Sequence, residues 1–180
     1  MIWLSNSTLA RLRDQLQARG QRPSLIASPG MTPETAELMT LLAEYGPLCE
    51  AMYLMMSADG KISNDEREVL KGALRNLSGD TIRSSQMESM LDTAGKNVVD
   101  QGREARMNEV VEQLREDRTR AEVAFVLAAA IAFADNAIAD EENETLNALA
   151  EGLGIDEGRA NELLDEVETD LAGQQGSTAS

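Results

Sequence analysis

The feature that most limits how this chain can fold is residues 119–134, a helical stretch that contains an unbroken apolar run. From Val123 to Ala134 the run has no polar or charged side chain. A helix that is hydrophobic on every side belongs in the middle of a soluble fold. The run is also far short of the roughly 20 residues that span a bilayer. We therefore expect a bundle built around this stretch, with no transmembrane segment.

The composition of the whole chain favours an all-α fold. Alanine, leucine, glutamate and methionine are common, β-branched alternation is scarce, and aromatic residues make up only 3%. These preferences leave helices to supply nearly all of the regular structure. A length of 180 residues suits one domain of ordinary size with a small appended segment.

Two matching turns indicate an internal duplication. When the sequence is aligned with itself at a shift of 76 positions, a pattern of small, acidic and apolar residues matches. The matching pairs are Ala58 and Ala134, Asp59 and Asp135, Ile62 and Ile138, Glu66 and Glu142, Glu68 and Glu144, and Leu70 and Leu146. Each turn ends one helix and starts the next, so we call residues 58–66 the first elbow and residues 134–142 the second elbow. The spacing predicts two repeated helix-turn-helix elbows around the central apolar helix.

Proline, glycine and charge divide the chain into four parts. We expect a basic N-terminal helix or docking arm over residues 1–22, a linker over 23–32, a helical domain over 33–172 and a disordered tail over 173–180.

Local signals inside the domain predict where helices start and stop. Pro47 is expected to kink or break the first helix of the domain, because proline has no backbone N–H and clashes with the preceding turn. Ser63 and Glu66 have the spacing of a capping box at the start of a helix. Gly95 and Gly102 predict a short separate helix between two breaks.

Residues 1–22 allow two interpretations. They carry four arginines against one aspartate, and three leucines fall on one helical stripe. The stretch is then either a helix packed on the domain or an amphipathic arm that docks on a partner or membrane surface, with a tryptophan as anchor. The candidate partner-binding residues are Trp3, Leu9, Arg11, Leu12, Arg13 and Leu16.

Charge and missing residue types exclude several functions. A net charge of −16 repels nucleic acid and anionic lipid, and leaves cations and basic protein surfaces as partners. The chain has no histidine, and its one cysteine is Cys49, so catalytic triads and histidine or multi-thiolate metal sites are ruled out. Any metal site must be built from oxygen. The single cysteine and the lack of a signal peptide favour the cytoplasm.

Catalysis is not expected. The sequence has no glycine-rich phosphate loop, nucleophile elbow or dinucleotide fingerprint, so we expect no organic cofactor. A hydrolase that uses pairs of Asp and Glu is the least favoured alternative, because the carboxylates look solvated.

The carboxylates of the elbows are the candidate functional residues. They either cap the helices of two well-made turns, or they gather into one all-oxygen cluster that binds calcium or magnesium. The candidate metal ligands are Asp59, Asp65, Glu66, Asp135, Asp140, Glu141 and Glu142.

Neither elbow is an EF-hand by itself. With Gly60 at the glycine position of a calcium loop, Asp59 and Glu66 fall on ligand positions, but the first two ligand positions hold Met55 and Ser57. The second elbow lacks ligands at the same first positions of the loop. A bound ion would need ligands from both elbows or from a partner.

At these elbows the sequence resembles the tellurite-resistance TerB-like family, whose signature is a small-Asp-Gly-x-Ile-x-x-x-Glu turn after an apolar helix. Residues 58–66 match this signature closely, and residues 134–142 replace its glycine by Asn136, which tolerates a left-handed turn. The resemblance is good over residues 54–74 and 106–155 and weaker between them, which places the domain at residues 33–172, and it implies an all-helical bundle with a clustered acidic surface that holds metal ions.

The resemblance also implies a role. TerB-like proteins act in tellurite or general stress resistance, within membrane-associated complexes rather than as enzymes, and a similar domain precedes J-domains in some co-chaperones. We therefore expect a non-enzymatic module that binds a divalent cation, a protein partner, or both, through its acidic surface. The alternative is a structural interaction or homo-oligomerisation module without metal.

Overall fold

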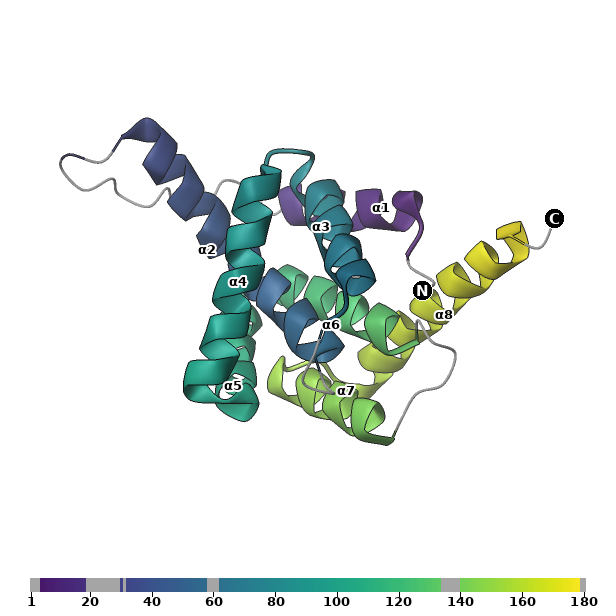
Figure 1. The fold of residues 1–180 in the computed structure, drawn as a ribbon. Helices are drawn as coiled ribbons and strands as arrows, with labels where there is room; N and C mark the ends of the chain where they lie inside the picture. Colours follow the sequence, from purple (N-terminus) through teal and green to yellow (C-terminus); the bar gives the residue numbers. More distant parts are fainter. Residues whose placement is uncertain (1–3, 19–29, 31, 58–61, 134–139, 179–180) are drawn as a thin grey trace.

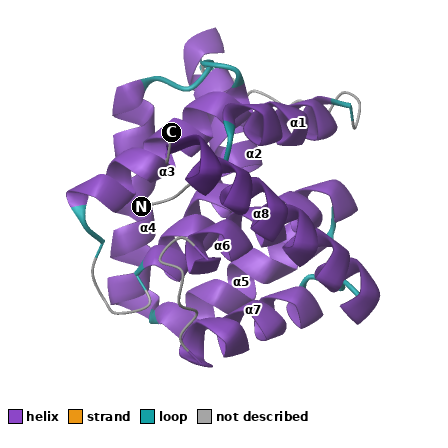
Figure 2. Ribbon diagram, turned by 90° about the vertical axis from the view of Figure 1, so that its right-hand side faces the viewer, coloured by secondary structure: helices purple, strands orange, loops and turns teal. Residues whose placement is uncertain are grey.

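The computed structural model describes residues 4–18, 30, 32–57, 62–133 and 140–178. This part of the chain contains eight helices and no strand. The helices are α1 (Asn6–Gln17), α2 (Pro33–Met56), α3 (Asn64–Ser78), α4 (Ser84–Gln101), α5 (Arg103–Arg115), α6 (Arg118–Phe133), α7 (Asp140–Gly152) and α8 (Glu157–Thr178). Figures 1 and 2 show them gathered into one bundle, with the N-terminal half of α2 and the C-terminal end of α8 extending beyond it. The all-α prediction is confirmed.

Helix α6 is the centre of the bundle, as its sequence predicts. It packs against α1, α2, α5, α7 and α8. Its buried residues are Ala121, Val123, Ala124, Phe125, Val126, Leu127, Ala128, Ala129, Ala130, Ile131 and Ala132. Within the described ranges, no helix combines the length and the apolar character that a membrane crossing requires.

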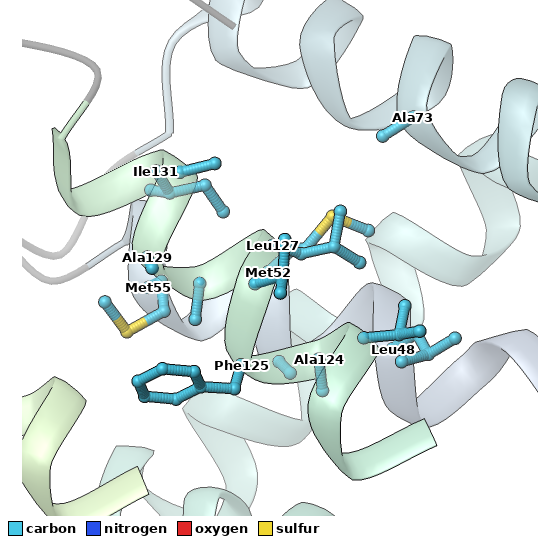
Figure 3. Close-up of a cluster of buried hydrophobic side chains, with 14 of the residues drawn as sticks. Leu48, Met52, Met55, Ala73, Ala124, Phe125, Leu127, Ala129 and Ile131 are labelled. Carbon is cyan, nitrogen blue, oxygen red and sulfur yellow. The ribbon is translucent and has the colours of Figure 1, made fainter. Parts of the chain in front are cut away.

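Helices α2 and α6, which lead into the two elbows, pack against each other and run in the same general direction. Figure 3 shows Leu48 and Met55 of α2 in the same order as Ala124 and Ala129 of α6. Leu48 and Ala124 are equivalent positions of the 76-residue repeat. The C-terminal ends of both helices therefore lie on the same side of the bundle.

Of the kink or break predicted at Pro47, the break is wrong, because α2 continues through this residue as one helix. Pro47 has no N–H to offer the carbonyl of Ala43, four residues earlier. Arg120 of α6 supplies the missing donor: its Nη2 donates to the carbonyl of Ala43 at 3.2 Å and to that of Glu44 at 2.9 Å. A side chain of the central helix thus completes the hydrogen bonding of α2.

Two further boundaries differ from the sequence predictions. Residues 84–101 form one helix, α4, instead of separate helices divided at Gly95. Gly95 lies inside this helix. A Cβ at this position would come within 2.9 Å of the hydroxyl of Tyr53, so the glycine provides room for a side chain of α2. The tail predicted to be disordered is helical up to Thr178, and it has no proline to stop the helix.

Candidate functional site

The first elbow is described on both sides of residues 58–61. On one side, Ser57 follows α2 and is buried, and its hydroxyl is one of the buried polar groups that find no hydrogen-bond partner in the described structure. On the other side, Ser63 Oγ accepts from the N–H of Glu66 at 3.2 Å, while Glu66 Oε2 accepts from the N–H of Ser63 at 2.6 Å. The predicted capping box is confirmed, and one carboxylate oxygen of Glu66 is engaged in it.

The seven predicted metal ligands are only partly described. Glu66 caps α3, and Asp65 is exposed in the first turn of the same helix. Asp59 and Asp135 lie outside the described residues. The remaining three occupy the first turn of α7, where their side chains are outside the description: Asp140, Glu141 and Glu142. Among the side chains that are described, no three Asp, Glu or Cys residues are grouped closely enough to hold a metal ion.

Helix α3 continues from the first elbow into an ion-pair network with α4. Arg67 donates to Glu88 at 2.6 Å and to Asp92 at 2.7 Å. Lys71 pairs with Glu68 at 2.9 Å and also with Glu88. The hydrogen bonds from Lys71 and then Arg67 lower the pKa of Glu88. Two cations pair with three carboxylates here, so the network leaves one net negative charge between α3 and α4.

The apolar half of the predicted partner-binding set lies in the core. Leu9, Leu12 and Leu16 are all buried where α1 packs on α3 and α6. In this arrangement they face the rest of the chain, which agrees with the interpretation of α1 as a helix packed on the domain. Trp3 lies outside the described residues.

The basic half of that set remains at the surface. Arg11 pairs with Glu166 of α8 at 3.4 Å, and both side chains are about half exposed. Arg13 lies 3.6 Å from Asp14 of its own helix. A partner role for these two arginines stays a prediction.

One important charged pair was not among the predicted site residues. Arg106 of α5 donates from Nε and Nη2 to the two oxygens of Glu50 of α2, at 2.6 and 2.8 Å, and both residues are buried. Its remaining Nη1 donates to Glu109 at 2.8 Å. The sequence does carry a signal for this pair, because Arg106 falls on the buried stripe of α5 that contains Val110 and Leu114. The arrangement joins two helices and leaves no free group for chemistry.

Comparison with known proteins gives one family. The family model described as tellurite resistance protein TerB matches residues 48–167, which run from the second half of α2 into α8 and include both elbows. Searches of curated proteins and of solved structures found no significant match.

Proposed function

Because the chain belongs to the TerB family of tellurite resistance proteins, we propose that it is a non-enzymatic cytoplasmic module that binds a divalent cation, calcium or magnesium, through the acidic residues of its two elbows. The proposed ligands are Asp59, Asp65, Glu66, Asp135, Asp140, Glu141 and Glu142. Such a module would serve tellurite or general stress resistance by presenting the ion-bound surface to a protein partner.

The observation that carries this proposal is the packing of α2 against α6 in the same general direction. Each elbow alone has too few oxygen ligands for a hard cation, which takes six or more. Because the two helices run in the same direction, both end on the same side of the bundle, where each leads into its elbow. This arrangement favours a site shared between the elbows. The buried hydroxyl of Ser57, without a partner in the described structure, is a further oxygen at the start of the first elbow.

A second candidate function has its own supporting observation. Glu66 is already used to cap α3, as expected if the elbow acids serve the fold and not an ion. Under this alternative the chain is a protein-interaction or oligomerisation module without metal, and its acidic surface attracts a basic partner by charge alone.

Thermal unfolding in the presence of calcium and magnesium separates the two candidates. An ion that binds only the native chain stabilises it by mass action, by about 1.4 kcal/mol when its concentration is ten times the dissociation constant. We expect millimolar calcium or magnesium to raise the unfolding midpoint above that in NaCl of equal ionic strength. The NaCl reference removes the general effect of screening a chain of net charge −16.

A matched pair of double variants assigns the effect to the elbows. D59N/D135N removes one acid from each elbow, and E112Q/E168Q removes the same charge from exposed residues of α5 and α8. The cation-dependent shift should disappear in the first variant and persist in the second. Equal shifts in the wild type and both variants would show that screening alone is responsible, and the cation proposal would then be rejected.

A further inference from the structure

We propose that the face of α3, α6 and α8 that α1 covers, here called the α1 groove, is a binding site for an amphipathic helix of a partner protein. In this proposal α1 is an intramolecular occupant of the groove, and the partner helix displaces it. The proposal does not depend on the elbows or on a bound cation.

The apolar contact of α1 has the form of a helix bound in a groove. Leu9, Leu12 and Leu16 are 1%, 2% and 3% exposed, although they belong to a single short helix at the edge of the bundle. Their spacing of three and four residues is the pattern by which amphipathic helices present anchors to a groove. The helix contributes one continuous stripe, and the receiving surface comes from the rest of the bundle.

Polar contacts fix the start of α1 on α8. The carboxylate of Asp170 accepts three hydrogen bonds: from the N–H of Ser5 at 2.9 Å, from the hydroxyl of Ser5 at 2.8 Å and from the hydroxyl of Thr8 at 2.8 Å. A negative charge at this end of a helix is also favoured by the helix dipole. One turn earlier in α8, Glu166 pairs with Arg11. The α1 groove therefore recognises a helix with hydroxyl residues in its first turn and a basic residue in its second.

Three features of α1 suit it to displacement. It is joined to α2 only through residues 18–32, and it lies outside the family match, whereas α3 and α6 lie inside it. With 12 residues it is marginally stable as an isolated helix. It also borders an open pocket of about 300 Å³ between itself, α6 and α8, whose lining includes the charged side chains of Glu122, Arg159 and Glu166.

These observations specify the partner helix. It carries leucines or similar residues at positions i, i+3 and i+7, a serine or threonine at its N-terminal end, and an arginine or lysine between the first two leucines. Charge supports the same choice, because the rim of the groove presents Glu166 and Asp170 to whatever occupies it.

The test uses the full chain with a specific protease site placed within residues 20–29, and a fluorescent peptide of residues 4–18 as the probe. Before cleavage, the tethered α1 competes at an effective concentration in the millimolar range. After cleavage the competitor is free to dissociate, so we expect the peptide to bind about tenfold or more tightly. A peptide with Leu12→Glu should not bind, because position 12 is buried in the groove, whereas one with Gln15→Ala, at an exposed position, should bind like the unmodified peptide.

Several results would overturn the proposal. If the cleaved chain does not bind the probe, or binds the Leu12→Glu peptide equally well, the groove is not a specific site. If cleavage and removal of the fragment abolish the helical circular dichroism, α1 is an integral part of the core. Hydrogen exchange on the intact chain gives an independent check, since amides of α1 should exchange faster than those of α6, and equal protection would contradict displacement. Sedimentation of the intact chain should show a monomer; a dimer that no longer accepts the probe would identify a second copy, and not another protein, as the occupant.

Discussion

At the scale of single residues, the buried ion pair of Arg106 and Glu50 joins α5 to α2. Both side chains are about 90% buried, and the guanidinium meets both oxygens of the carboxylate. Removal of Glu50 leaves Arg106 buried but still paired with Glu109 through Nη1, so the cost should be about 2–3 kcal/mol, at or below the lower end of the range for a buried charge left unpaired. We expect E50A to lower the free energy of unfolding in urea by this amount.

Two controls define this prediction. The variant R11A breaks the half-exposed pair with Glu166 and should cost less than about 1 kcal/mol, because solvent screens such pairs. The double variant E50L/R106M replaces both charges with apolar groups and should recover much of the loss. A double variant that is no more stable than E50A would show that the charges, and not their pairing, are needed.

Cys49 gives a pH dependence at the same scale. Burial, with a smaller effect of the neighbouring Glu50 charge, raises the pKa of its thiol to about 12, whereas an unfolded cysteine has a pKa of about 8.5. Between these values the unfolded chain loses the thiol proton and the native chain keeps it, so the native state binds more protons. The free energy of unfolding should therefore fall as pH rises above 9, by up to about 1.4 kcal/mol per pH unit from this thiol.

Urea unfolding of the wild type and C49A at pH 8, 9 and 10 isolates the contribution of the thiol. Other groups that titrate in this range are common to both chains and cancel in the difference. We expect C49A to lose less stability than the wild type as the pH rises. Parallel curves for the two proteins would contradict the raised pKa.

At the scale of elements, the side chain of Arg120 lets α2 continue through Pro47. Without this side chain the carbonyls of Ala43 and Glu44 lose this donor; Ala43 is exposed, so water can bond its carbonyl, and the loss should be that of an ordinary hydrogen bond, about 0.5–1.5 kcal/mol. We expect R120A to destabilise the chain and to speed hydrogen exchange in the first half of α2. In a P47A background a backbone N–H is restored, so R120A should cost less there. Additive effects in this double-mutant cycle would show that the two residues act independently.

The same helices show what sequence can and cannot predict. The start of α3 was predicted correctly because its cap involves residues three positions apart. The break at Pro47 was wrong because the donor that repairs the helix comes from Arg120, which no local signal connects to Ala43. The break at Gly95 was wrong because the glycine makes room for Tyr53, a contact between two helices.

For the whole molecule, the duplication and the all-round apolar run together predicted the fold. A helix that is apolar on all sides has to be surrounded by other helices, and α6 packs against α1, α2, α5, α7 and α8. The candidate site was harder to predict. The sequence shows which acids recur, but whether Glu66 caps a helix or binds an ion depends on its partners in space, and here a backbone N–H is one of them. The long-range contacts of Asp170 with Ser5 are not indicated by any local sequence pattern in either segment.

The central position of α6 also determines when the chain can fold as it is made. The buried face of α2 is covered by a helix whose last residue, Phe133, is synthesised 77 residues after Met56. At a usual rate of 5 to 20 residues per second, α2 waits roughly 4 to 15 seconds for this cover. During that interval α3, α4 and α5 can already pack on α2, whereas the face of α2 that contacts α6 stays uncovered on the nascent chain.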